Sequence, residues 1–247
     1  HEVGGPGQSE IEIHHHPLRK AGDVTMLVKY IIRMVANKYD KTVTFMPKPL
    51  YNEAGSGMHI HVKLFKNQQP LFYDENGYAG LSELALNFIG GILHHGPALL
   101  AFTNPSTNSY KRLVPGFEAP VKAIFGLANR SAAIRIPKYD NTPNEKRFEF
   151  RPPDATCNIY LALSALLMAG IDGIKKKIDP TKAGFGPYDV NIFQLPKSEM
   201  EKIKSLPTSL FEAMEALKED HEFLTDGGIY SEELIENWID YKIIKEY

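Results

Sequence analysis

The stretch RFEFRPPD, residues 147–154, alternates charged and aromatic side chains over its first five positions. Successive side chains of a β-strand point to opposite faces, so Phe148 and Phe150 share one face while the charged residues share the other. The same alternation runs from Gly57 to Phe65, and a third strand is predicted around Arg135. In the strand predicted at residues 57–65, one face carries Met58, Ile60, Val62 and Leu64, and the other face carries His59, His61 and Lys63. Each strand therefore predicts an apolar face for packing and a polar face for chemistry.

The remaining segments predict further strands and several helices. Alternation predicts half-buried or short strands at residues 8–16 and 41–46, and apolar spacing predicts a helix over residues 24–35 capped by Asp23. Apolar helices are expected over residues 81–102, loosened at Gly90, Gly91 and Pro97, and over residues 158–177, and the rest of the chain is predicted to be helical. Residues 103–120, with three prolines, predict a long irregular loop of functional character.

This mixed order of strands and helices, joined by short links, predicts the α+β class. We expect a curved antiparallel β-sheet whose polar face lines a site and whose outer face is covered by helices.

Composition excludes several classes of protein. The 247 residues carry a formal net charge of −2, which provides no global field for nucleic acid or an anionic membrane. The single cysteine, Cys157, excludes an internal disulfide framework, and its expected role is that of a small core residue. No apolar run long enough to span a bilayer and no signal peptide is recognisable, so a soluble cytoplasmic protein is expected.

The polar faces of the predicted strands combine three kinds of side chain. Carboxylates with an imidazole suit a hard divalent ion such as Mg²⁺ or Mn²⁺, and several arginines suit phosphate or carboxylate ligands. In the absence of a nucleophilic Ser or Cys motif, this mixture points to phosphoryl transfer. The residues concerned are Glu2, Glu10, His59, His61, Arg135, Arg147, Glu149 and Arg151.

Residue types alone leave simpler interpretations open. A single Arg-Glu-Arg strand face is more often a surface ladder of salt bridges, and two histidines at i and i+2 are more often a solvated face. We interpret His14, His15 and His16 as a strand end, and we assign no function to His94 and His95.

Five motifs, in order along nearly the whole chain, resemble glutamine synthetase of the bacterial type. They are HEVGGPGQSE at residues 1–10, KPLYNEAGSGMHIH at 48–61, NSYKRLVPGFEAP at 108–120, NRSAAIRIP at 129–137 and RFEFRPPD at 147–154. The resemblance implies the catalytic domain of that family over residues 1–247, without the small N-terminal domain and the C-terminal extension.

The resemblance also implies roles for individual residues. It implies metal ligands for Mg²⁺ or Mn²⁺ at Glu2, Glu10, His59 and Glu149, ATP contacts at His61, Lys63, Arg130, Arg135 and Arg147, and glutamate contacts at Gly55, Arg112, Glu118 and Arg151. Arg130 resembles the arginine that stabilises the phosphoryl group in flight, and Glu118 resembles the glutamate of a flap that closes the site.

The chain departs from the family pattern at four positions. Lys63 stands where the family usually has serine, Ala54 where many members have asparagine, and Asn144 near a nucleotide lysine of some members. Phe193 stands where some bacterial members carry a tyrosine that is modified by adenylylation, and phenylalanine has no hydroxyl to modify.

The implied activity is ATP-dependent ligation of ammonia to L-glutamate through a γ-glutamyl phosphate. A relative that ligates glutamate to another amine, or a non-catalytic homologue, remains an alternative. The expected partners are small molecules, with neither nucleic acid nor membrane. The full-length parent is expected to be a homododecamer, and this fragment a monomer or small oligomer without useful activity.

Overall fold

The computed structural model describes residues 4–117, 119–139 and 142–246. Its main sheet has four strands in the order β1-β6-β5-β4. Their bounds are β1 Ile60–Val62, β6 Phe148–Phe150, β5 Ala132–Ile136 and β4 Lys122–Leu127. The register places His61 opposite Glu149 and Glu149 opposite Arg135, while Ile60, Phe150 and Ile134 form the neighbouring row. The polar and apolar faces predicted from alternation are therefore aligned across three strands.

One strand pairing differs from the antiparallel prediction. β1–β6 and β6–β5 are antiparallel, but β4 and β5 pair in parallel. Their connection, residues 128–131, is much shorter than the dozen or more residues that usually join parallel strands. It begins at Ala128 with a φ of 56°, and both the backbone N–H and the hydroxyl of Ser131 donate to the Asn129 side chain. Side-chain alternation contains no information on strand direction, so the sequence could not predict this pairing.

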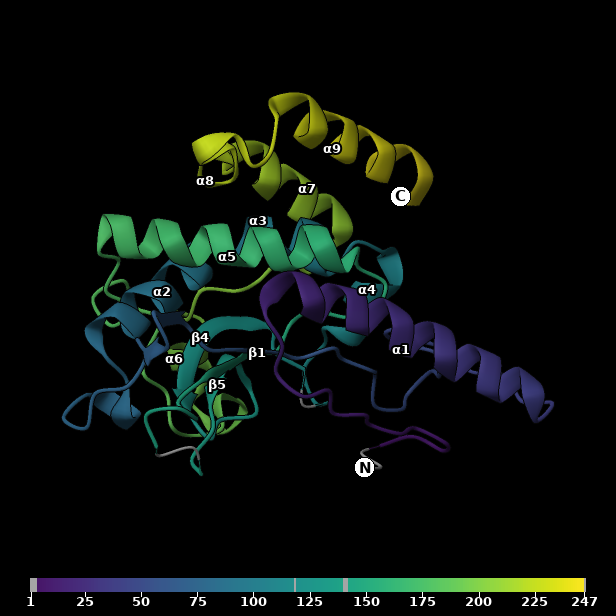
Figure 1. Cartoon of the computed structure of the whole chain (residues 1–247), viewed down its shortest axis with the longest axis horizontal. Helices are drawn as coiled ribbons and strands as arrows, with labels where there is room; N and C mark the ends of the chain where they lie inside the picture. The colour runs from purple at the N-terminus through teal and green to yellow at the C-terminus, as the bar shows by residue number, and fades with distance from the viewer. Residues whose placement is uncertain (1–3, 118, 140–141, 247) are drawn as a thin grey trace.

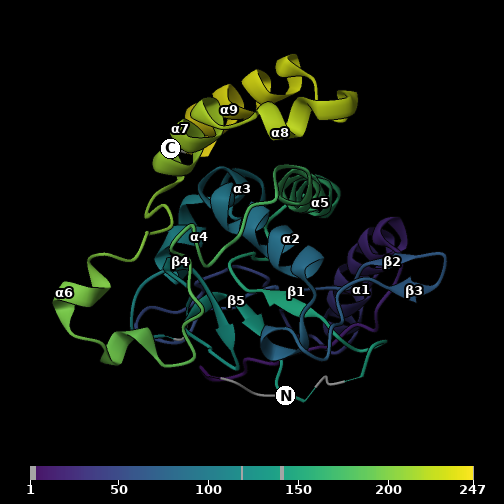
Figure 2. The same cartoon turned by 90° about the vertical axis from the view of Figure 1, so that its left-hand side faces the viewer.

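Helices cover the apolar face of the sheet, as predicted (Figures 1 and 2). Above β1, β5 and β4 lie α2 (Glu83–His94), α3 (Gly96–Thr103) and α5 (Ile159–Lys176). The ring of Phe148 in β6 lies 5.9 Å from that of Phe88 in α2 and 5.7 Å from that of Phe72. Full burial of one such side chain stabilises the fold by about 1.5–3 kcal/mol. This aromatic contact therefore fixes which face of the sheet remains for the polar row.

The predicted helix over residues 81–102 is two helices that meet at a bend. α2 begins at the N-cap Ser82, and His95 both ends α2 and precedes α3. His95 is buried, and its two ring nitrogens lie 2.8 Å from carboxylate oxygens of Asp172 in α5 and of Asp220. The bend is thus tied to the helices on both sides of it.

A second helical layer lies over α3 and α5. It consists of α7 (Leu210–Glu219), α8 (Glu222–Thr225) and α9 (Glu232–Glu246) (Figure 2). Trp238 in α9 donates from its indole N–H to the carbonyl of Ala101 and stacks on Phe102, with ring centroids 5.6 Å apart. The single tryptophan of the chain therefore anchors α9 to the core.

The remaining elements are short. They are the hairpin β2 (Phe65–Lys66) and β3 (Gln69–Pro70), helices α4 (Thr107–Arg112) and α6 (Lys197–Met200), and 3₁₀ turns at Tyr78–Gly80, Ile192–Gln194 and Asp226–Gly228. α4 shows that part of the loop predicted at residues 103–120 is ordered, because Ser106 and Ser109 form a reciprocal capping box.

Three predictions at the N-terminal side are wrong. α1 runs from Leu18 to Lys38 and begins after Pro17, so Asp23 is not its N-cap; instead Asp23 accepts a hydrogen bond from the hydroxyl of Tyr160. Neither residues 8–16 nor residues 41–46 form a strand in the described structure. A strand requires a hydrogen-bonded neighbour, and among the described residues neither segment has one.

Within the described residues, no single helix is long and apolar enough to cross a membrane. Taken together, α2 and α3 have the length and composition of a membrane span, and by those two criteria only; a 73° bend separates them.

The crossing of α2 and α5 depends on glycine. A Cβ on Gly173 would lie 2.2 Å from the carbonyl oxygen of Asn87 and 2.5 Å from the backbone nitrogen of Gly91. We predict that Gly173→Ala destabilises the protein by about 1–3 kcal/mol in urea unfolding, because the two helix backbones must separate. Gly96→Ala is the matched control, since its Cβ would meet only the flexible end of Leu206 at 3.3 Å. Equal stability of the two variants would contradict this packing.

Candidate functional site

The site is organised around one buried carboxylate on the face of the sheet that points away from α2 and α5. Glu149 in β6 is 1% exposed. Its Oε1 lies 2.7 Å from Nδ1 of His59 and accepts a hydrogen bond of 2.9 Å from Nη1 of Arg151. Its Oε2 lies 2.5 Å from Nε of Arg135 in β5. Two arginines and one histidine, from three segments of the chain, therefore converge on a single side chain.

The ionisation of this cluster follows from burial and charge. Burial by itself would raise the pKa of Glu149, but the hydrogen bond with His59 and the charges of Arg151 and Arg135 outweigh it and lower the pKa to about 2. Burial also lowers the pKa of His59. At neutral pH a neutral imidazole therefore donates its Nδ1 proton to an ionised carboxylate, which can only accept. Nε2 of His59 retains its lone pair.

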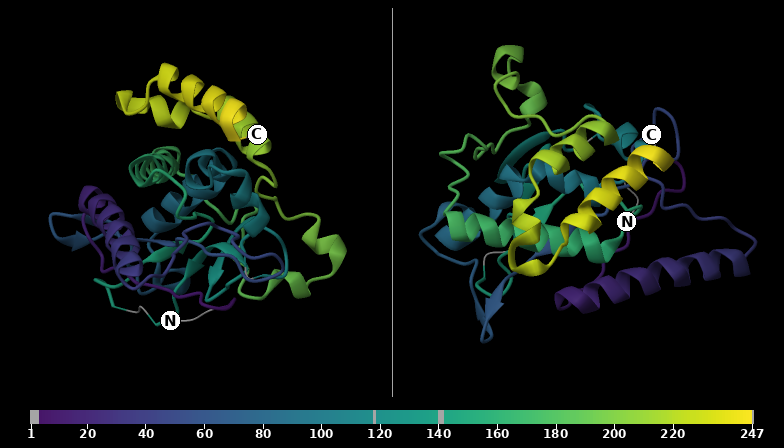
Figure 3. Two further views of the ribbon diagram at one scale, coloured as in Figure 1. Left: turned by 90° about the vertical axis from the view of Figure 1, so that its right-hand side faces the viewer. Right: turned by 90° about the horizontal axis from the view of Figure 1, so that it is seen from above.

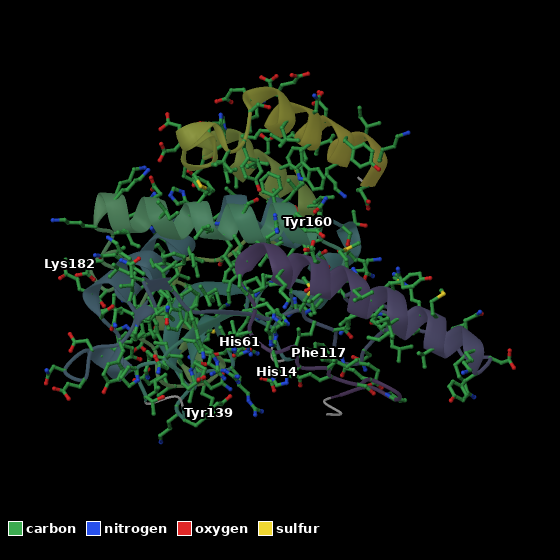
Figure 4. The ribbon with its side chains drawn as sticks, in the orientation of Figure 1. His14, His61, Phe117, Tyr139, Tyr160 and Lys182 are labelled. Carbon is green, nitrogen blue, oxygen red and sulfur yellow. The ribbon has the colours of Figure 1, made fainter. Side chains whose placement is uncertain are left out.

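His61 and Arg147 form the adjacent part of the site. Nε of Arg147 donates to Nδ1 of His61 over 3.2 Å, and burial lowers the pKa of His61 to about 4. The neutral His61 then carries its proton on Nε2. In Figure 4, His61 and Tyr139 lie on the side of the sheet opposite to α5, and the guanidinium of Arg147 lies 6.0 Å from the Tyr139 ring.

Lys63 and His15 lie near Arg147 and His61 in the same part of the site. Nζ of Lys63 lies 2.5 Å from Oε2 of Glu145, which also lies 3.6 Å from Nη1 of Arg147. The His15 ring lies edge-on to His61, with centroids 6.3 Å apart. The sequence interpretation of His15 as a strand end missed this proximity, because it depends on the path of residues 8–16.

The side chain of Arg112 is fixed by hydrogen bonds to the backbone carbonyls of residues 151–153. The guanidinium of Arg112 is buried and donates to the carbonyls of Pro152 (2.6 Å), Pro153 (3.3 Å) and Arg151 (3.0 Å). Burial lowers its pKa to about 10. A Cβ on Gly55 would lie 2.7 Å from the Arg112 side chain, so Gly55 is in close contact with this arginine. The structure thus brings two predicted glutamate contacts together, at the end of β6.

A buried amide network supports the same segment. Asn104 is fully buried and donates to the carbonyl of Pro152 over 2.7 Å and to Oδ2 of Asp154 over 3.1 Å. Asp154, also fully buried, accepts from the backbone N–H of Thr156. Sequence reasoning missed both residues, since a lone Asn and a lone Asp in irregular segments carry no periodic signal.

The other predicted site residues are either exposed or outside the described residues. Arg130 is exposed on the connection between β4 and β5, and Glu10 is exposed in the extended segment before α1. Glu2 and Glu118 lie outside the described residues. No three His, Cys, Asp or Glu side chains gather as a metal-binding group among the residues that the structure describes.

The donor set nevertheless fits part of a site for a hard divalent cation. Oε2 of Glu149 is buried and, within the described part of the chain, receives no hydrogen bond of adequate geometry. Together with Nε2 of His59 it offers two of the ligands that Mg²⁺ or Mn²⁺ accepts. Two protein ligands are too few to hold such an ion firmly, so the remaining ones must come from elsewhere.

Comparison with known proteins gives consistent results. The family profile described as glutamine synthetase, catalytic domain, matches residues 1–247. A glutamine synthetase of Mycolicibacterium smegmatis is 56% identical over 242 residues, which are 98% of this chain and 50% of that protein. One of Nostoc sp. is 55% identical over 246 residues, 100% of this chain and 51% of that protein. The chain thus spans about half the length of the curated relatives it matches.

Two solved structures have the same fold. A cryoEM structure of glutamine synthetase from Plasmodium falciparum superposes with a TM-score of 0.78 at 34% identity, covering 92% of this chain and 50% of that one. A structure of GmaS without ligand gives a TM-score of 0.76 at 31% identity, covering 91% and 49%.

The Glu149 cluster leads to a prediction on stability and pH. Glu149→Gln leaves two guanidinium groups without their carboxylate, and a folded pKa of about 2 corresponds to about 3 kcal/mol of stability at pH 7. Because the folded pKa lies below the unfolded one, this stability is present above about pH 4.5 and is lost as the pH falls toward 2. We expect urea unfolding at pH 7 to show the loss, and the variant to have a flatter stability profile between about pH 5 and 3.

Glu145→Gln is the matched control, because its side chain is 56% exposed and its pair with Lys63 is screened by water. It should change the unfolding free energy by less than about 1 kcal/mol. If both variants were equally stable, the Glu149 cluster would not be the charge centre of the site.

Proposed function

Because the chain belongs to the glutamine synthetase catalytic-domain family, we propose that it supplies the nucleotide and glutamate side of an ATP-dependent glutamate–ammonia ligase. The observation that carries the proposal is the concentration of Arg135, Arg147 and Arg151 around Glu149 and His61 on one face of the sheet. Such a face suits two anionic substrates, ATP and L-glutamate, which must approach each other against their mutual repulsion. We further propose a cytoplasmic location for the assembled enzyme and a homododecameric parent.

The reaction has two steps. A γ-carboxylate oxygen of glutamate attacks the γ-phosphorus of ATP, the bond to the bridging oxygen breaks, and ADP leaves. Ammonia then attacks the γ-carbonyl carbon of γ-glutamyl phosphate, inorganic phosphate leaves, and the nitrogen loses a proton to give glutamine. The first step converts a poor leaving group into a good one.

The residues of this chain position and neutralise charge in this scheme. Arg112 and Arg151, with Gly55 beside them, are proposed to bind glutamate, and His61, Lys63, Arg135 and Arg147 are proposed to bind ATP. Two N–H groups of Arg112 remain for a ligand after its three carbonyl contacts, because a guanidinium carries five. The rigid backbone anchoring of Arg112 supports a positioning role, since a fixed donor loses little freedom when the ligand binds.

Mg²⁺ or Mn²⁺, when bound, would neutralise the phosphate charge during transfer. His59 and Glu149 are proposed to hold one such ion and Glu2 and Glu10 another, each with further ligands. Glu118 is proposed to close the site and exclude water, which would otherwise hydrolyse the acyl phosphate.

A second candidate activity is the ligation of glutamate to a different amine. The arginines around Glu149 and His61 would serve that reaction equally well, because its phosphoryl step does not involve the amine. The two activities share the phosphoryl step and differ in the nucleophile. A coupled assay of ADP release by the full-length parent, with ATP, L-glutamate and either ammonium or methylammonium, separates them. The absence of ADP release with both nucleophiles would reject both activities.

We expect Arg130→Ala to lower the rate of phosphoryl transfer in the assembled enzyme by ~10³-fold or more while changing ATP affinity much less. The reason is that a transition-state arginine binds charge that develops only during transfer. Single-turnover kinetics and equilibrium ATP binding measure the two quantities separately. A loss confined to affinity would assign Arg130 to ground-state binding.

We expect the isolated 247-residue chain to form no glutamine and no dodecamer-sized particle. His59 and Glu149 supply only two ligands for one cation, and a hard ion with few protein oxygens binds weakly. A glutamine-formation assay with ATP and Mg²⁺, run beside light scattering, tests both statements. Turnover similar to that of the full-length relatives would show that the described residues form a complete site.

A further inference from the structure

Asn104 is a polar residue in the interior of the helical layer. It ends α3 and is fully buried. In the left view of Figure 3, the helices α2 and α3 (blue) and α5 (green) lie between the strands and the yellow C-terminal helices. Nδ2 of Asn104 donates to the carbonyl of Pro152 over 2.7 Å and to Oδ2 of Asp154 over 3.1 Å, and Oδ1 accepts from the hydroxyl of Thr103. Both amide hydrogens are therefore used by one segment, residues 152–154.

These side-chain bonds tie two segments together and do not cap the helix. The backbone N–H of Asn104 completes α3 by donating to the carbonyl of Leu100. A further backbone bond, from the N–H of Asp154 to the carbonyl of Thr103 over 3.2 Å, joins α3 to the same segment. The end of α3 is therefore a fixed support for the residues that follow β6.

The carbonyl of Pro152 is shared between Asn104 and Arg112. Nη1 of Arg112 donates to it over 2.6 Å, and Asn104 donates to it over 2.7 Å. A carbonyl oxygen has two lone pairs, so these two donors occupy both. The peptide plane of Pro152 cannot turn without weakening its bond to Asn104, and the second lone pair therefore stays directed at the guanidinium. Asn104 thus acts on Arg112 through the backbone.

Asp154 links the same amide to the charge of Arg112. Asp154 is fully buried, and its Oδ1 accepts from the backbone N–H of Thr156 while its Oδ2 accepts from Asn104. The three carbonyls that accept from Arg112 are neutral. Burial lowers the pKa of Arg112, and the negative charge of Asp154 opposes this effect. Asn104 is therefore bonded both to the carbonyl that orients the guanidinium and to the carboxylate that offsets its charge.

We propose that Asn104 is a positioning residue for L-glutamate, which it aligns through the Pro152 carbonyl and Arg112. The inference rests on the proposed function, in which Arg112 binds glutamate. A guanidinium recognises a carboxylate by paired, directional hydrogen bonds, so a small rotation weakens both of them. Without the amide of Asn104, the peptide plane of Pro152 is free to turn and the guanidinium turns with it. The effect is specific to glutamate, because other residues are proposed to bind ATP.

Asn104→Leu in the full-length parent tests the proposal, because leucine has nearly the shape of asparagine and no donor. We expect the KM for L-glutamate to rise by about ten-fold or more and the KM for ATP to stay within about two-fold, in a coupled assay of ADP release with ammonium. Neither KM depends on the amount of folded enzyme, so a loss of stability lowers only the maximal rate. If Asn104→Leu does not fold, Asn104→Ser, which leaves room for a water molecule, is measured in the same way with the same expected selectivity.

Tyr230→Phe is the matched control. Tyr230 is 3% exposed, and both partners of its hydroxyl, Leu161 and Ser164, lie in α5. The control should lose stability in urea unfolding and keep the KM for glutamate of the parent. The inference is overturned by an active Asn104 variant with an unchanged KM for glutamate, by equal rises in the two KM values, or by the same rise in Tyr230→Phe. A parent that releases no ADP with L-glutamate would instead reject the proposed function, and this inference with it.

Discussion

The geometry of the site depends on one ion cluster, in which the carboxylate of Glu149 meets His59, Arg135 and Arg151. A buried carboxylate without partners would be neutral, and buried arginines without a carboxylate would repel each other and any cation. Glu149 therefore needs its partners in order to stay ionised, and the two arginines need Glu149 to offset their mutual repulsion. The strand register supplies the fixed distances, because Glu149 lies between His61 on one side and Arg135 on the other.

The apolar side of the same strands explains why the cluster stays in place. Phe148 and Phe150 are fully buried against the helices, so β6 cannot rotate without exposing them. α2 and α5 reach this position because glycine on both helices lets their backbones touch. Behind the strand end, Asn104 and Arg112 both donate to the carbonyl of Pro152. Helix packing and buried hydrogen bonds thus restrain the polar row from two directions.

Local patterns predicted those features that depend on a single strand or helix. The alternation at residues 57–65 and 147–151 was sufficient to place His61 and Glu149 on one face, and Asn158 caps the predicted helix that follows. Features that depend on a partner were not predictable. The segments at residues 8–16 and 41–46 have the pattern of strands but no hydrogen-bonded neighbour in the part of the chain that the structure describes. The parallel pairing of β4 with β5 could not be predicted either, because side-chain alternation does not depend on strand direction. The contacts of Asn104, Asp154 and His15 join residues that are far apart in sequence, so only the fold could bring them together.

Lys63 departs from the family pattern, and a neighbouring carboxylate offsets part of the positive charge that it adds to the site. A lysine where the resemblance leads one to expect serine adds a positive charge beside Arg147 and His61. Its ammonium lies 2.5 Å from Glu145, which also lies near Arg147, so one carboxylate offsets part of the added charge. Glu145 is exposed, and water can replace it at low cost, whereas Glu149 is buried and cannot be replaced in this way. A phosphate entering this side of the site would therefore compete with Glu145 for Lys63 and leave the Glu149 cluster intact.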